Sequence, residues 1–312
     1  LARGTRAAGL LGYGGGIALS SAVLTGALLR LAGAPGVNGI ADAAIVLLAL
    51  LAASDIGITL VNLWVTHFCP ASVLPGLELV DGVPAELRTV IAMPVLLTSM
   101  ADIEEYVRHL EVHYLATQDG DIRFALLTDW TDSVTETAAD DAAVLAAAVA
   151  GVARLNRLYG GINGEDRFLL LHRRRLWNST QRRWMGWERK RGKLHEFNLL
   201  LRGSKDTSFI AVGGRPLKAP GGVQYVISLD ADTRLPRGAA LSLIGKMAHP
   251  LNKPVIDAAQ RRVTAGYGIL QPRVTPSLPI AQEASRFQGI FSGPSGIDPY
   301  AFAVSDAYQD AF

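Results

Sequence analysis

The sequence predicts an α/β domain with a mainly parallel sheet flanked by helices, preceded by two transmembrane or membrane-interface helices. In the second part of the chain, short apolar runs alternate with segments of helical periodicity, which is typical of parallel strands joined by helices. Two long apolar stretches occupy the first part. The composition agrees, because 49% of the 312 residues are hydrophobic, only 19% are charged and the mean hydropathy is +0.24. The chain is therefore too apolar for an ordinary soluble domain.

Residues 10–32 and 43–68 are the two candidate membrane helices. At about 1.5 Å per residue, each is long enough to cross a hydrocarbon layer of about 30 Å. The second contains Asp55 near its middle, which would cost roughly 2.5–3.5 kcal/mol to insert. Either Asp55 faces other helices, or the segment bends there and its second half, with Trp64, lies at the membrane surface.

Residues 1–69 are thus interpreted as a membrane-spanning segment. Arg3 and Arg6 precede the first helix, and the loop between the helices carries little charge. The positive-inside rule then places both outer flanks, and with them the bulk of the chain, in the cytoplasm. The chain begins at Leu1, and its last residues, DAYQDAF, show no pattern typical of the end of a domain. It is therefore interpreted as a fragment of a longer polypeptide.

After a linker at residues 70–86, strands and helices are expected to alternate through residues 87–312. Apolar runs of strand length predict the sheet, and apolar residues at helical spacing predict the connections. The expected strands are 89–94, 122–128, 168–172, 224–229 and 267–271, and the expected helices are 101–116, 137–159, 193–201 and 238–248.

Polar clusters directly follow three of these strands. They are TDWTDS with Asp129 and Asp132, then HRRR, then DADTRLP with Asp230 and Asp232. Open α/β sheets bind ligands outside the carboxyl ends of their strands, so these clusters are candidates for a site. Two carboxylates two residues apart can reach one divalent cation, which is the kind of ion that bridges a nucleotide diphosphate. The alternative is a solvated loop, because Asp-x-Asp by itself is a weak motif.

Longer strings carry a more specific signal. WERKRGKLHEFNLLLRG, VISLDADTRLP, GILQPRV and FSGPSGIDPYAFAVSDAYQDAF resemble the glycosyltransferase region of cyclic β-1,2-glucan synthases. The resemblance extends from the second membrane stretch to the last residue. It implies a GT-A fold and an inverting, processive glucosyltransferase that uses UDP-glucose with Mg²⁺ or Mn²⁺. It also implies a multi-pass protein of the inner (cytoplasmic) membrane, with the catalytic domain on the cytoplasmic side.

The resemblance also implies roles for residues of the donor site. Asp230 and Asp232 would form the DXD motif that holds the metal and the diphosphate. Asp129 would contact the uridine. Lys193 and Asn198, in GKLHEFN, would approach the diphosphate.

Further roles concern the nucleotide pocket and the acceptor. Pro94 would line the nucleotide pocket, while Gln271 and Arg273 would lie on the acceptor side. The acidic general base of the family and its Arg-Trp motif have no counterpart before residue 312, so no catalytic base is assigned. The implied partners are the UDP-glucose donor, a β-glucan acceptor, membrane lipid and the missing C-terminal portion of the polypeptide, with no nucleic acid expected.

The strongest alternative is a non-enzymatic membrane module. Residues 172–193 mix Arg and Lys with tryptophans, a pattern that can bind nucleic acid or anionic lipid. His109 and His113 are spaced to share a helix face for zinc, but a third ligand is not apparent, so a helix face with His109 beside Glu105 is expected. The single cysteine excludes an intramolecular disulfide, and the phosphate-loop and dinucleotide fingerprints do not occur.

Overall fold

The computed structural model describes residues 2–33, 39–68, 74–117 and 120–272. The chain divides into two compact units. One comprises Leu1–Val73 with Gln271–Phe312, and the other comprises Leu74–Leu270. Each unit is described by itself.

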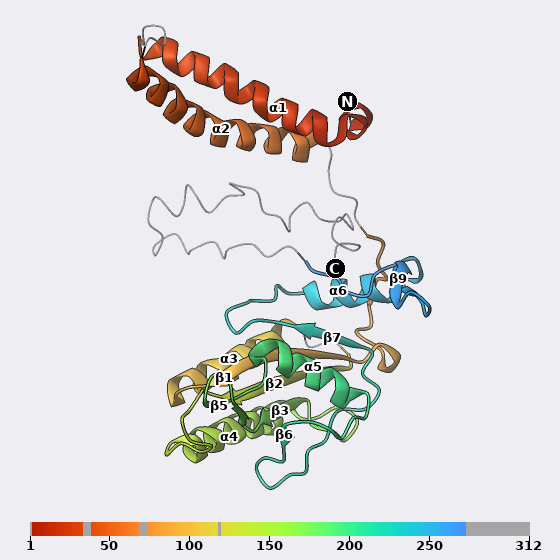
Figure 1. Ribbon diagram of the computed structural model, residues 1–312. Coiled ribbons are helices and arrows are strands. Elements are labelled where there is room, and N and C mark those ends of the chain that lie inside the picture. Colours follow the sequence, from red (N-terminus) through yellow and green to blue (C-terminus); the bar gives the residue numbers. More distant parts are fainter. Residues whose placement is uncertain (1, 34–38, 69–73, 118–119, 273–312) are drawn as a thin grey trace. The chain divides into compact units, whose positions relative to one another are not determined.

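The described part of the first unit is an antiparallel pair of long helices, α1 (Ala2–Leu31) and α2 (Ile40–Phe68) (Figure 1). A β-carbon at Gly57 would lie only 2.7 Å from the Ser21 Oγ, so the two helices approach closely there. The Tyr13 hydroxyl donates to the Asn62 Oδ1 at 2.8 Å. Small residues and a hydrogen bond between helices are typical of packing in membranes.

Both helices are long and apolar enough to cross a membrane, over Leu11–Leu31 and Ile40–Trp64. α2 continues through Asp55 as one helix and leaves this carboxylate exposed. Asp55 therefore does not interrupt the helix, and its exposed position suits contact with other helices. A third helix, α4 (Asp141–Tyr159), also meets the length and composition criteria, but it packs Val144 and Ala148 into the core of the second unit.

The second unit is built on a mixed, mostly parallel sheet with the strand order β6-β3-β2-β1-β7 (Figure 1). All pairings are parallel except that of β6 with β3. This confirms the predicted fold class of a mainly parallel sheet flanked by helices. The strands are β1 (Thr89–Leu97), β2 (Ile122–Trp130), β3 (Phe168–Arg173), β6 (Phe209–Ile210) and β7 (Tyr225–Ser228).

Side chains alternate between the two faces of the sheet, as the period of a strand requires. Ile91 and Met93 of β1 join a core with helices α3 (Met100–Ala116), α4 and α6 (Ala239–Ala248), whereas Val90 and Ala92 join a second core with α5 (Arg189–Leu201). The sheet is therefore buried on both faces, which explains why its central strands read as continuous apolar runs.

One edge of the sheet is closed by a side chain. β6 pairs with β3 only at His172 and Arg173, so the earlier part of β3 lies at the edge. There Asn156 of α4 accepts from the Phe168 N–H at 2.9 Å and donates to the Phe168 carbonyl at 2.8 Å. The amide of Asn156 thus satisfies the backbone groups that a neighbouring strand would otherwise pair.

The fifth predicted strand, at 267–271, is wrong. These residues form no strand, and the nearby hairpin consists instead of β8 (Val255–Asp257) and β9 (Arg262–Ala265). Gly266 ends β9 with φ of 71°, and a β-carbon there would lie 2.0 Å from the Lys253 carbonyl oxygen. The Tyr267 N–H then donates to the Asn252 carbonyl at 2.9 Å, so the apolar run follows the segment before β8 and does not join the five-stranded sheet.

A second hairpin was not predicted. β4 (Leu176–Asn178) pairs with β5 (Arg183–Met185), and Asn178 closes the turn by accepting from the N–H groups of Thr180 and Gln181, both at 3.0 Å. Its basic and aromatic residues hid the strand pattern. The remaining elements are two short 3₁₀ helices, Ala85–Leu87 and Pro250–Asn252.

Candidate functional site

The strand order places a topological switch point between β1 and β7. From β1 the chain proceeds to β2 and β3 on one side, and β7 lies on the other. Paired register between β1 and β7 ends at Ala92 and Ser228, after which the Leu229 N–H donates to the Ala92 carbonyl at 3.0 Å. Pro94, two residues on, has no N–H to offer on this side. β1 and β7 are therefore no longer paired at the carboxyl edge of the sheet, where open α/β sheets bind ligands.

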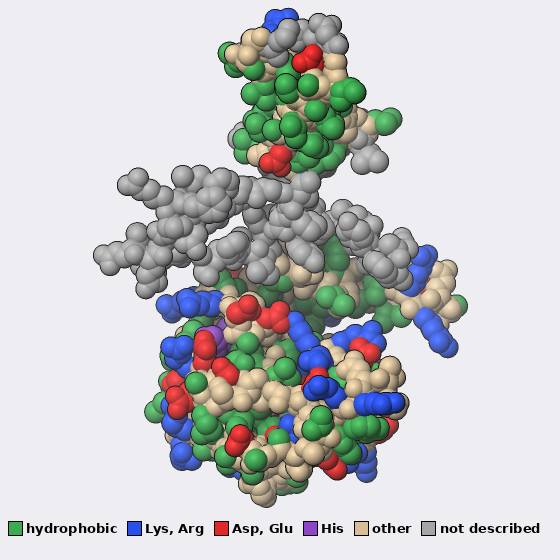
Figure 2. Space-filling view, turned by 60° about the vertical axis from the view of Figure 1, so that its left-hand side comes forward, with side chains coloured by type: hydrophobic (Ala, Val, Ile, Leu, Met, Phe, Trp, Pro, Cys, Tyr) green, Lys and Arg blue, Asp and Glu red, His purple; other side chains and the backbone are tan. Residues whose placement is uncertain are grey.

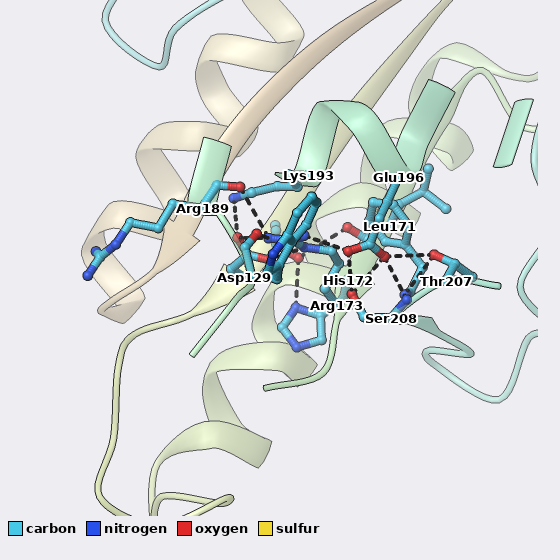
Figure 3. A network of polar contacts seen from close by, with 12 residues as sticks. Asp129, Leu171, His172, Arg173, Arg189, Lys193, Glu196, Thr207 and Ser208 are labelled. Carbon is cyan, nitrogen blue, oxygen red and sulfur yellow. Dashed lines mark hydrogen bonds and ion pairs between the residues drawn. The ribbon is translucent and has the colours of Figure 1, made fainter. Parts of the chain in front are cut away.

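A buried ion-pair network occupies the α5 side of this edge (Figure 3). The Arg173 Nε donates to the Asp129 Oδ1 at 2.7 Å, and the Arg173 Nη2 donates to the Asp129 Oδ2 at 2.9 Å. The Arg173 Nη1 donates to the Glu196 Oε1 at 2.7 Å. Asp129 and Arg173 are at most 1% exposed. Such bidentate, charge-assisted bonds fix both partners in one geometry.

Backbone groups complete the network. Glu196 also accepts from the Ser208 N–H at 2.6 Å and from the Thr207 hydroxyl at 3.0 Å. Burial alone would raise the pKa of Glu196, but hydrogen bonds from Ser208 and Arg173 lower it below its usual value. Burial would likewise lower the pKa of Arg173, but Asp129 and Glu196 raise it. Arg173 is therefore one cation held between two carboxylates.

Lys193 joins the network from the first turns of α5. Its Nζ lies 3.1 Å from the Asp129 Oδ2 and donates to the Val95 carbonyl. Lys193 is only 2% exposed. Burial lowers the pKa of Lys193 to about 8, although the negative charge of Asp129 acts to raise it. Lys193 is thus a cation of the interior, behind the surface of the edge.

The acidic turn after β7 lies at the surface. The Thr233 N–H donates to the Asp230 carbonyl at 3.0 Å and closes a turn over Asp230-Ala231-Asp232. Both carboxylates are exposed, and Asp230 forms an ion pair with Lys190. Lys190 precedes Lys193 by one helical turn. The first turn of α5 therefore links the outer carboxylate, Asp230, to the inner network.

Four of the predicted site residues lie at this edge, and the others do not or lie outside the described residues. Asp129 and Lys193 are in direct contact, and Asp230 and Asp232 share the turn beside them. Asn198 is exposed and, five residues after Lys193, lies about 140° away around α5, so the structure does not bring it to this edge. Gln271 is exposed and falls in the other compact unit. Arg273 lies outside the described residues.

Sequence reasoning missed Arg173, Glu196 and Lys190. HRRR was recognised as a cluster after β3, yet Arg173 was not singled out from it. Arg173 is the side chain next to Asp129 on the neighbouring strand, because register pairs Thr128 with His172 one residue earlier. That position at the end of a strand was the available signal. Glu196 gave none, because its role depends on the loop at Ser208.

The basic segment 172–193 is largely neutralised. Besides Arg173, Arg175 pairs with Asp141, and Arg189 pairs with Asp132. On the face shown in Figure 2, acidic and basic side chains are interspersed over this unit and do not gather in patches of one sign. A continuous basic surface, which nucleic-acid binding requires, is not evident on that face.

A cavity of about 530 Å³ lies elsewhere, between α4, the β3 edge and residues 210–220. Its walls are mainly apolar. The charges at its rim are paired, Arg215 with Asp166 and Lys218 with Glu165 at 2.9 Å. It contains none of the predicted site residues that the structure describes.

His109 and His113 do not form a zinc site. His113 is buried in the core, and burial lowers its pKa to about 4. The His109 Nε2 lies 3.7 Å from the Glu105 carboxylate, as expected for a helix face. Within the described residues, no three His, Cys, Asp or Glu side chains gather to hold a metal.

Comparison with known proteins agrees with the motifs of the sequence. No protein-family model matches the chain. Over 264 residues, which are 85% of the chain, it is 52% identical to the cyclic beta-(1,2)-glucan synthase NdvB of Rhizobium meliloti (strain 1021). The chain spans only 9% of the length of that relative. The resemblance to the cyclic β-1,2-glucan synthases, predicted from four sequence strings, is thereby confirmed for this segment.

Proposed function

We propose that this chain is the donor-binding part of a membrane-bound, inverting GT-A glucosyltransferase that transfers glucose from UDP-glucose to a growing β-1,2-glucan. The observation that carries the proposal is the exposed Asp230-Ala231-Asp232 turn at the switch point of the sheet, in a chain 52% identical to a cyclic glucan synthase. The name of the relative supports glucan synthesis, and the turn supplies two carboxylates that could hold a divalent cation for a nucleotide diphosphate.

The donor groups of the turn fit a divalent cation. Mg²⁺ is commonly held by one or two carboxylates, with substrate phosphates and water as the other ligands. Asp230 and Asp232 offer two exposed carboxylates of this kind, and a third protein ligand is not needed. Bound Mg²⁺ or Mn²⁺ would neutralise the charge that develops on the departing diphosphate.

Other residues near the turn would contact the remaining parts of the donor. Lys190 is the exposed cation beside Asp230 and can contact the diphosphate, while Lys193, buried and paired with Asp129, would hold Asp129 in place behind it. Asp129 and Pro94 would define the uridine end of the pocket. The acceptor hydroxyl would attack the anomeric carbon in line and invert it from α to β. We assign no described carboxylate as the base that takes its proton.

The membrane assignment rests on α1 and α2. Both are long and apolar enough to span a bilayer, and we propose that they anchor a multi-pass protein in the inner membrane with the sheet on the cytoplasmic side. A polymerising enzyme held there would meet UDP-glucose from the cytoplasm.

Calorimetry on the detergent-solubilised chain tests the proposal. UDP should bind in the presence of Mn²⁺, and the double variant Asp230→Ala/Asp232→Ala should lose this metal-dependent binding. Asp206→Ala, which removes an exposed carboxylate elsewhere, should bind as the unaltered chain does. A folded chain that binds UDP equally well with and without metal, or not at all, would contradict the proposal.

A further inference from the structure

A side chain of a distant helix contacts the backbone of the acidic turn at its centre. The Nδ1 of His109, in the middle of α3, lies 2.7 Å from the carbonyl oxygen of Ala231, which is 122 residues further along the chain. Ala231 is the residue between the two aspartates. The bond therefore holds the centre of the Asp-Ala-Asp turn.

The backbone of the turn is held at this centre, and its outer contact is the ion pair of Asp230 with Lys190. The Ala231 methyl group packs against the core beneath α3, and its carbonyl accepts from His109. Asp230 and Asp232 remain exposed on either side. Holding the middle residue thus leaves both carboxylates exposed at the surface, Asp230 beside Lys190.

The chemistry of the contact fixes the role of the imidazole. A carbonyl oxygen only accepts, so the His109 Nδ1 must carry the proton and donate. Nδ1 is protonated in the imidazolium as well as in this neutral tautomer. Glu105 lies near the other ring nitrogen, Nε2, at 3.7 Å, and so does not take part in this bond.

We propose that His109 is a positioning residue that sets the spacing of Asp230 and Asp232 for a divalent cation. This inference rests on the proposed function, since it concerns the same turn. Without the anchor, the turn would sample other conformations, and the two carboxylates would hold the cation in fewer of them. The effect belongs to metal affinity, because His109 contacts neither carboxylate.

Metal binding measured directly tests the role. Free Mn²⁺ would be followed by electron paramagnetic resonance in the 312-residue chain in detergent, with UDP present. His109→Ala should weaken Mn²⁺ binding roughly three- to ten-fold, as expected for one lost hydrogen bond. Circular dichroism would verify that each variant is folded.

Two amide substitutions make the test specific. The Asn amide nitrogen is as many bonds from the backbone as Nδ1, whereas the Gln amide nitrogen matches Nε2. His109→Asn should therefore restore Mn²⁺ affinity, His109→Gln should not, and Glu105→Gln should change nothing. Unaltered affinity in His109→Ala, a folding defect shared equally by Asn and Gln, or equal failure of Asn and Gln to restore binding would overturn the inference. If the unaltered chain binds no Mn²⁺ with UDP, the proposed function fails and this inference with it.

Discussion

Asp129 is an anion whose two compensating cations are buried with it. Replacing Asp129 with Asn would leave Arg173 and Lys193 facing a neutral amide without water, and uncompensated buried charge is costly. We expect Asp129→Asn to lower the free energy of unfolding by about 3–5 kcal/mol. Urea unfolding followed by tryptophan fluorescence would measure the loss.

The matched control is the exposed pair of Arg215 and Asp166, whose side chains are 70% and 42% exposed. Asp166→Asn should cost less than about 1 kcal/mol, because solvent screens such pairs. Equal effects of the two substitutions would show that the Asp129 network contributes no more than a surface ion pair.

Among single residues, those at strand ends were the most predictable from sequence. Asp129, Asp230 and Asp232 were recognised because each follows an apolar run, and the strands before them exist. Arg173 escaped because three arginines stand together and sequence alone does not say which one turns inward. Asn198 was assigned by motif, but the helical rotation after Lys193 carries it to an exposed position.

At the scale of elements, the connection between β5 and α5 must pass directly against the buried network. A β-carbon on Gly186 would lie 2.8 Å from the Asp129 Cγ and 3.0 Å from the Arg173 Nη2. Gly186→Ala should therefore destabilise the chain by about 1–3 kcal/mol, as overpacking does. Thermal unfolding would detect it, with Gly221→Ala as the control, because nothing lies within 4 Å of that position. A neutral Gly186→Ala would mean that the connection can shift aside freely.

The helical hairpin makes a similar demand at Gly57. Leucine there should separate α1 from α2, since even a β-carbon would lie 2.7 Å from the Ser21 Oγ. Cysteines at Gly16 and Val61, in a Cys69→Ser background, should cross-link in the unaltered hairpin, because a β-carbon on Gly16 would lie 3.6 Å from Val61. Gly57→Leu should abolish the cross-link.

The control for the hairpin is Gly26→Leu, where nothing lies within 4 Å. It should leave the cross-link intact. Persistent cross-linking in Gly57→Leu would show that the close approach at Gly57 does not hold the pair together.

Helices and strands whose apolar residues recur with one clear period were predicted well. Elements whose path depends on tertiary contacts were not. The strands at 89–94 and 122–128 and the helix at 101–116 exist, with the strands extending further toward their carboxyl ends. Residues 267–271 include the apolar Tyr267, Ile269 and Leu270, but Gly266 and the backbone of Lys253 constrain their path. The hairpin of β4 and β5 depends on the turn at Asn178 and was hidden by its charge.

For the whole molecule, two buried imidazoles predict sensitivity to acid. Burial lowers the pKa values of His113 and His172 from 6.5 to about 4. The unfolded chain therefore binds these protons below pH 6.5, whereas the folded chain resists them down to pH 4. Stability is fully present above pH 6.5 and is lost as the pH falls toward 4, by roughly 3 kcal/mol for each group.

Substitution of His113 isolates one half of this effect. His113→Leu should reduce the loss of stability between pH 6.5 and 4 by about half, measured as unfolding free energy against pH. His195→Leu, at an exposed position, should leave the pH dependence unchanged. An unaltered slope in His113→Leu would place the acid sensitivity in other groups.

The amide of Asn156 has a consequence that reaches beyond one molecule. A strand at the edge of a sheet offers its free backbone groups to any other strand, and such edges promote aggregation. By pairing with both backbone groups of Phe168, Asn156 denies this position to an incoming chain. A polar residue on an alanine-rich helix thereby helps to keep one copy of the domain from joining another edge to edge, which matters most where many copies are crowded together on a membrane.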